Sequence, residues 1–199
     1  TLSSLFQSDL NLGWDSRNHI KFYQEKLIPY FKADTLKTLE PFQHKNPWLN
    51  DFRGKICVVS SFSETMKMQL VNLEKIHPHL ELGDVNWSFV KAAQTNGMVE
   101  PKYDYLFYLE RMFTDVLNEE PDLVLLSCGS YAAPLSGMLM ANGISNVVVG
   151  GSLQLLFGIK GKRWDARTDY TNFYNEYWVR PKDTERPQGS DLIEDSCYW

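Results

Sequence analysis

Short apolar runs alternate with amphipathic segments along most of this chain. Four runs predict strands, at residues 55–60, 87–90, 122–127 and 146–149, and the run at 122–127 has the composition of a strand buried on both faces of a sheet. Elsewhere apolar side chains recur with the spacing of one helix face. This spacing predicts helices over 19–31, 63–77, 103–118 and 131–142 and a helical turn over 153–157.

The alternation of strand and helix from residue 55 onwards predicts the fold class. Such an order is typical of a parallel sheet with helices on both faces. We therefore expect a Rossmann-like three-layer α/β/α domain with a mainly parallel central sheet and, because periodicity fades after Gly158, an irregular C-terminal extension. The length fits a single domain over 1–199, and the missing initial Met favours a domain cut from a longer multidomain chain.

Small and polar residues follow each of the four predicted strands, at 60–65, 94–97, 128–131 and 150–152. In parallel sheets, ligands bind at the carboxyl ends of the strands, near the point where the strand order reverses. Ser63 is the expected N-cap of its helix. Helix N-termini at Ser63, Ser130 and Ser152 would direct backbone N–H groups towards an anion. The sequence therefore predicts a phosphate-binding edge of the sheet.

A glycine-spaced cationic segment follows the last predicted strand. It contains three cations within four residues, Lys160, Lys162 and Arg163, in a chain whose formal net charge is −5. Lysine and arginine side chains bind phosphate, and glycines let the backbone approach a ligand closely. Trp164 or Tyr131 could stack on a base or a sugar. The alternative interpretation is a solvated basic loop.

The usual fingerprints of nucleotide enzymes are absent from the sequence. There is no Gly-x-Gly-x-x-Gly and no Gly-x-x-x-x-Gly-Lys-Ser/Thr. We therefore expect a nucleotide or nucleotide-sugar site built from several loops. Its predicted donor-binding residues are Ser61, Ser63, Gly129, Ser130, Tyr131, Gly150, Gly151, Gln154, Lys160, Gly161, Lys162, Arg163 and Trp164.

Several segments together resemble a family of bacterial proteins associated with surface-polysaccharide synthesis, and also a domain of the multidomain glycosyltransferases of large algal viruses. The segments lie at 54–59, 61–65, 128–135, 151–165, 175–181 and 197–199. The most specific is Gly-Ile-Lys-Gly-Lys-Arg-Trp-Asp at 158–165, and the resemblance covers roughly residues 40–199. It implies a glycosyltransferase domain that uses a donor such as UDP-L-rhamnose. An early Gly-x-x-Glu or Asp-x-Asp element is missing, which leaves a requirement for Mg²⁺ or Mn²⁺ open.

Four carboxylates are candidates for the general base that would deprotonate an acceptor hydroxyl in a single inverting displacement. They are Asp165, Glu64, Glu176 and Asp15. Each has a structural alternative. Asp165 beside Arg163 could anchor its loop, Glu64 could complement a helix dipole, Glu176 could lie in a packed C-terminal strand, and Asp15 could be an N-cap.

The composition limits the classes of binding partner and the cellular compartments that we expect for this protein. The acidic balance argues against non-specific nucleic-acid binding, and no apolar run approaches the roughly 20 residues that span a bilayer. The three cysteines show neither disulfide nor metal-ligand spacing, which favours a reducing, cytoplasmic compartment. The expected partners are a nucleotide-sugar donor, a glycan acceptor and sister domains of a longer chain. The rival functions are a non-catalytic nucleotide-sugar or glycan-binding module and a hydrolase or epimerase, the last disfavoured by the missing dinucleotide fingerprint.

Overall fold

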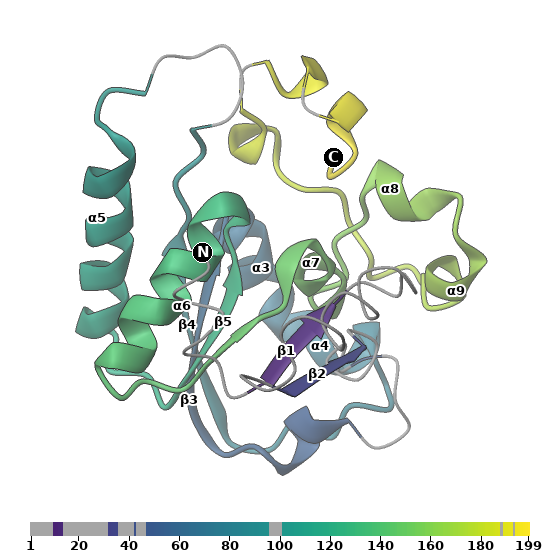
Figure 1. Ribbon diagram of the computed structural model, residues 1–199. Coiled ribbons are helices and arrows are strands. Elements are labelled where there is room, and N and C mark those ends of the chain that lie inside the picture. Colours follow the sequence, from purple (N-terminus) through teal and green to yellow (C-terminus); the bar gives the residue numbers. More distant parts are fainter. Residues whose placement is uncertain are drawn as a thin grey trace.

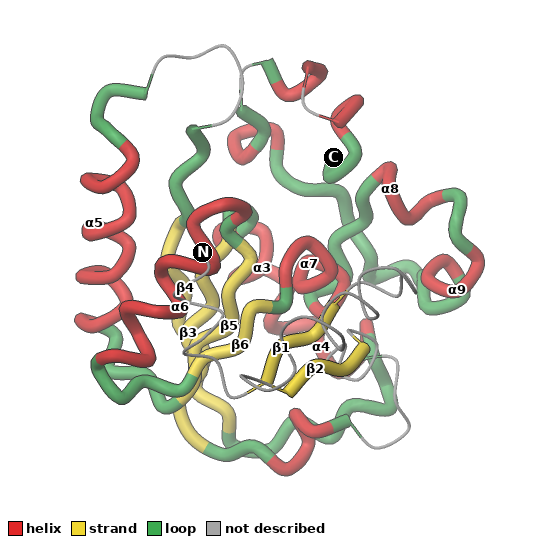
Figure 2. The backbone as a smooth tube through the Cα atoms, in the orientation of Figure 1, coloured by secondary structure: helices red, strands yellow, loops and turns green. Residues whose placement is uncertain are grey.

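A four-stranded, all-parallel sheet forms the centre of the computed structural model, which describes residues 10–13, 32–35, 42, 47–95, 101–187, 189–192 and 194–199 (Figure 1). The strands are β3 (Gly54–Ser60), β4 (Val85–Lys91), β5 (Leu123–Ser127) and β6 (Asn146–Val148), in the order β4-β3-β5-β6. The parallel sheet with helices on both faces confirms the predicted Rossmann-like α/β architecture (Figure 2).

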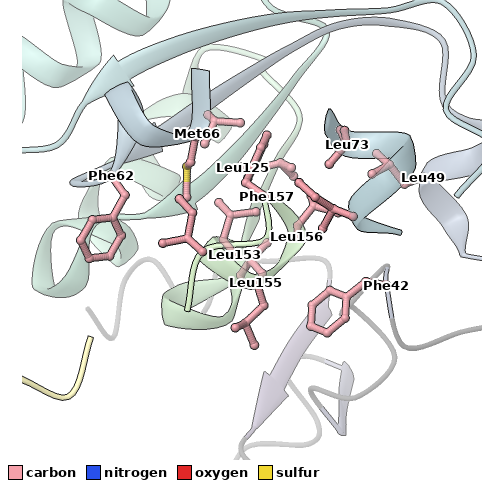
Figure 3. Close-up of a cluster of buried hydrophobic side chains, with 14 of the residues drawn as sticks. Phe42, Leu49, Phe62, Met66, Leu73, Leu125, Leu153, Leu155, Leu156 and Phe157 are labelled. Atoms are coloured by element: carbon pink, nitrogen blue, oxygen red, sulfur yellow. The ribbon is translucent and has the colours of Figure 1, made fainter. Parts of the chain in front are cut away.

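Alternate side chains of the central strands β3 and β5 pack on opposite faces of the sheet. Ile56, Val58 and Leu125 belong to one buried cluster, together with α3 (Ser63–Gln69), α4 (Leu73–Ile76) and α7 (Leu153–Leu156). Figure 3 shows part of this cluster. Cys57 and Val59 belong to the second, with α5 (Tyr105–Asn118) and α6 (Ala132–Ala141). Burial on both faces explains why these strands appear as continuous apolar runs in the sequence.

Helix boundaries depart from prediction mainly between residues 63 and 77. The expected single helix is divided into α3, a 3-10 turn over Leu70–Asn72 and α4. Ser63 is the first residue of α3 and not its N-cap, which is Phe62 and provides no side-chain hydrogen bond. Asp104 is the N-cap of α5, since its carboxylate accepts a hydrogen bond from the Phe107 N–H.

The C-terminal extension is irregular, as predicted, and backbone hydrogen bonds join its own segments to one another. It contains α8 (Lys162–Asp165), α9 (Thr168–Thr171) and 3-10 turns at Asp183–Glu185, Ser190–Leu192 and Glu194–Ser196. Ile159 forms a parallel bridge with Val179. The N–H groups of Lys162 and Arg163 donate to the carbonyl oxygens of Trp199 and Cys197.

A second, two-stranded parallel sheet pairs β1 (Leu10–Gly13) with β2 (Lys32–Thr35). The helix predicted over 19–31 and the candidate base Asp15 lie outside the described residues. Cys57, Cys128 and Cys197 are free thiols, and the first two are buried.

Candidate functional site

A cavity of about 380 Å³ lies at the carboxyl edge of the sheet, where the strand order reverses. After β3 the chain continues to β4 on one side, whereas β5 and β6 lie on the other side of β3. The loops that follow β3 and β5 therefore diverge and leave a crevice between them. Loops from all four strands contribute to the wall, and Pro187, Tyr198 and Trp199 of the extension complete it.

Seven of the predicted donor-binding residues lie in this wall. They are Ser61, Gly129, Ser130, Tyr131, Gly150, Gly151 and Gln154. These seven residues lie after β3, β5 and β6 in the chain. The three wall residues from the C-terminal extension were not predicted, because nothing in their local sequence indicates that the chain returns to the sheet edge.

Two wall glycines have a backbone conformation that leaves space for a ligand. Gly129 has φ +57° and Gly150 has φ +75°, and each begins a 3-10 turn. A Cβ atom built on either residue would meet no atom within 4 Å. The wall is therefore bare backbone at two points, next to the ends of β5 and β6.

Gln154 is a fully buried polar side chain in the same wall. Its Nε2 donates to the carbonyl oxygens of Ile159 at 3.2 Å and Tyr198 at 3.3 Å, which orients the amide. Its Oε1 has no hydrogen-bond partner among the described residues, and neither has the buried Nε1 of Trp199. Buried polar atoms are rarely left without a partner. Among the described wall residues, these two buried atoms are thus an unpaired acceptor and an unpaired donor.

The part of the wall that follows β5 is neutral and is held by a ring stack and hydrogen bonds. The Tyr131 ring stacks on Tyr105 with the ring centroids 4.3 Å apart, and its hydroxyl forms a 3.0 Å hydrogen bond with Thr95 Oγ1. Tyr105 in turn donates its hydroxyl to the Ser130 carbonyl. Burial raises the pKa of the Cys128 thiol to about 12, so this wall residue is not a thiolate nucleophile at neutral pH.

The three cations of the segment 160–163 are not part of the wall. The Lys160 Nζ lies 5.2 Å from the centre of the Tyr174 ring, and the Lys162 Nζ donates to the Asp195 carbonyl at 3.2 Å. Arg163 donates to the Tyr198 hydroxyl at 2.9 Å and stacks over its ring. Two of the three cations thus touch a residue of the cavity wall, Lys162 through its backbone N–H to the Trp199 carbonyl and Arg163 through its guanidinium to Tyr198.

Trp164 is a core residue, which corrects the prediction that it could stack on a ligand. It is 2% exposed and packs against Tyr170 and Tyr198. Gly161 is required beside it, since a Cβ there would lie 2.8 Å from the indole ring. The Gly-Lys-Arg-Trp pattern therefore reflects packing of a tight turn onto a buried indole.

The N-terminus of α3, predicted to bind an anion, already holds one from within the chain. The fully buried Glu185 carboxylate accepts the Glu64 N–H at 2.8 Å, the Thr65 N–H at 3.3 Å and the Thr65 hydroxyl. Ser63 is buried at this turn and does not line the cavity. Glu185 was missed because it lies in the extension that the sequence predicts only as irregular.

The structure does not bring the three described candidate bases into the cavity wall. Asp165 forms a 2.5 Å ion pair with Arg180, as the loop-anchor alternative predicts. Glu64 pairs with Lys91 at 3.2 Å and Lys182 at 3.7 Å, and the hydrogen bond and charge of Lys91 lower its pKa. Glu176 is exposed and does not line the cavity.

Metal sites, membrane spans and known relatives add no further assignment. Within the described ranges, no three His, Cys, Asp or Glu side chains are grouped closely enough to hold a metal ion. In the same part of the chain, no helix has the length and apolar character needed to cross a membrane. Comparisons with protein-family models, with curated proteins and with solved structures gave no match.

Proposed function

We propose that the chain is a glycosyltransferase domain that binds a nucleoside diphosphate sugar in the cavity and transfers the sugar to a glycan acceptor. The observation that carries the proposal is the position of the cavity at the reversal point of a parallel sheet, where such folds bind ligands. Its volume of about 380 Å³ falls in the range of small-molecule sites, roughly 300–1,000 Å³. The resemblance described above adds the donor class, UDP-linked L-rhamnose or another deoxyhexose.

The proposed reaction is a single inverting displacement. The acceptor hydroxyl oxygen attacks the anomeric carbon, the bond from that carbon to the diphosphate oxygen breaks, and a carboxylate takes the hydroxyl proton. Backbone N–H groups at the cavity stabilise the negative charge of the departing diphosphate. Because Asp165, Glu64 and Glu176 lie outside the wall, Asp15 is the base that we propose to test first.

Release of free UDP tests this function directly. The protein would be incubated with UDP-L-rhamnose and a panel of oligosaccharide acceptors, with and without Mg²⁺ or Mn²⁺, beside UDP-glucose and GDP-, dTDP- and CMP-linked sugars. We expect acceptor-dependent release of UDP in cytoplasm-like reducing buffer. Asp15→Asn should abolish release while calorimetric donor affinity stays unchanged. Absence of both release and donor binding throughout the panel would disprove the proposal.

A second candidate function is a binding module without catalysis. It is favoured by one observation: among the described residues, the cavity wall contains no Asp, Glu or His that could act as a base. The same assay separates the two functions. A module would bind the donor, measured by calorimetry, and release no UDP with any acceptor.

A further inference from the structure

Two helix N-termini flank the point where the strand order reverses. At only one of them does a side chain of the described residues accept hydrogen bonds from the backbone N–H groups. At α3 the Glu185 carboxylate accepts the N–H groups of Glu64 and Thr65. At the other start, the turn Gly129–Tyr131 leads directly into α6, and the N–H groups of Gly129 and Ser130 have no acceptor within the described residues. Gly129 and Ser130 are both exposed and both line the cavity. The first turn of a helix attracts anions through these N–H groups and through the helix dipole.

The glycines next to this helix start allow a ligand to lie directly against the backbone. Gly129 and Gly150 leave empty the space that a side chain would fill. A phosphate oxygen must come within hydrogen-bond distance of an N–H, about 2.9 Å, and a Cβ at these positions would stand in its way. This feature is independent of the helix start, because Gly150 follows a different strand.

The buried amide of Gln154 indicates that the occupant carries hydrogen-bond donors as well as an anion. Its Nε2 is committed to two backbone carbonyls, so its unpaired Oε1 requires an N–H or O–H from elsewhere. A bare phosphate at neutral pH is mainly an acceptor. A nucleotide sugar supplies phosphate oxygens together with the hydroxyl and N–H donors of its sugars and base.

We infer that the diphosphate of the ligand is held by the backbone N–H groups of Gly129 and Ser130, beside Gly150, and not by the cations of residues 160–163. Gln154 accepts a hydrogen bond from the sugar or base of the same ligand. The assignment rests on the proposed function for the identity of that ligand. It explains why the cavity wall carries no charged side chain among the described residues and still suits an anionic ligand.

A pair of glycine variants with similar backbone strain tests the phosphate cradle, by which we mean the backbone N–H groups of Gly129 and Ser130. Gly129→Ala is compared with Gly143→Ala, because Gly143 also has positive φ, +74°, and also has no atom within 4 Å of a built Cβ, but lies outside the wall. Lys162→Ala tests the rival cationic site. Affinities for inorganic pyrophosphate, UDP and UDP-glucose are measured by calorimetry, and Tm reports folding.

We expect Gly129→Ala to weaken pyrophosphate and UDP binding about 10- to 150-fold, the range for losing a hydrogen bond to a charged group. Gly150→Ala should weaken both ligands as well. Gly143→Ala should lower Tm by a similar amount and leave the affinities as in the parent chain. Lys162→Ala should also leave the affinities as in the parent chain. Equal binding by Gly129→Ala and Gly143→Ala, or loss of binding in Lys162→Ala, would overturn the cradle.

The parent chain separates failure of the cradle from failure of the function. Binding of UDP that survives Gly129→Ala rejects the cradle and keeps the proposed function. Binding of pyrophosphate that is lost in Gly129→Ala, with no binding of any nucleotide, keeps the cradle and rejects the function. No binding of any of the three probes rejects both.

A Gln154→Met variant locates the second contact of the ligand. Weaker binding of UDP-glucose but not of UDP places the Gln154 contact on the transferred sugar, and equal weakening of both places it on the nucleoside. The matched control is Gln69→Met, a second buried glutamine that ties down a backbone carbonyl away from the cavity, and equal loss of affinity in both variants would reject the Gln154 contact.

Discussion

Replacing Glu185 should cost far more stability than replacing any exposed carboxylate of the chain. The side chain is fully buried and accepts hydrogen bonds from two backbone N–H groups and one hydroxyl at the start of α3. Glu185→Ala leaves these donors without a partner, at about 1–3 kcal/mol for each buried group. Since water reaches part of this turn in the variant, we expect a loss of about 2–5 kcal/mol, against a typical domain stability of about 5–15 kcal/mol.

Glu185→Gln tests how much of that loss comes from the negative charge. Its amide oxygen can still accept one N–H, whereas its NH₂ group opposes the remaining donors. We therefore expect an intermediate loss of about 1–2 kcal/mol. Urea unfolding followed by tryptophan fluorescence gives both values, and an unchanged slope shows that the native state stays compact.

Glu176→Ala is the matched control, because Glu176 is an exposed glutamate of the same extension. It should change the free energy of unfolding by no more than about 0.5 kcal/mol. If Glu185→Ala costs no more than Glu176→Ala, the buried carboxylate does not fasten the extension to α3, and the reasoning is refuted.

Three further predictions address packing, pH and thiol chemistry. Gly158→Ala should destabilise the fold by about 2–4 kcal/mol, measured by urea unfolding, because φ is +64° and a Cβ would lie 2.8 Å from the Ile76 side chain; an unchanged midpoint would contradict it. Burial lowers the pKa of His77 to about 4, below its unfolded value of about 6.5, so its contribution to stability is full above pH 6.5 and is lost as pH falls towards 4, by up to about 3 kcal/mol. His77→Gln should flatten this acid limb of the stability curve, and an identical limb would exclude His77 as its cause. Burial raises the pKa of Cys57 to about 11 and of Cys128 to about 12, so iodoacetamide at pH 8 should modify Cys197 first, as mass spectrometry of peptides would show.

The parts of the structure that could be predicted from sequence depend on local patterns. β3 and β5 are buried on both faces and therefore appear as continuous apolar runs, and the wall residues Ser61 and Gly129 follow the strand ends that those runs define. The parallel order of the sheet then follows from the helices between the strands.

The parts that could not be predicted depend on contacts between distant segments. The cations of residues 160–163 contact Tyr174, Asp195 and Tyr198, up to 35 residues away, and no local pattern shows which way they point. Glu185 reaches α3 across 121 residues. A cluster of charged residues in the sequence thus does not establish phosphate binding until the contacts of its side chains in the fold are known. Here the side chains contact aromatic rings, a tyrosine hydroxyl and a backbone carbonyl.

Docking of the extension and occupation of the cavity should be thermodynamically coupled. Pro187, Tyr198 and Trp199 form one side of the cavity, and Glu185 fastens the same segment to α3, with a second bond from the Gln94 amide to the Glu185 carbonyl. A ligand that contacts this side binds only the docked state, so the apparent affinity is the intrinsic affinity multiplied by the fraction of molecules whose extension is docked. Glu185→Ala should therefore weaken UDP binding although it touches no wall atom, and saturating UDP should restore part of its lost Tm. Weaker binding without such restoration would mean that the ligand does not contact the extension.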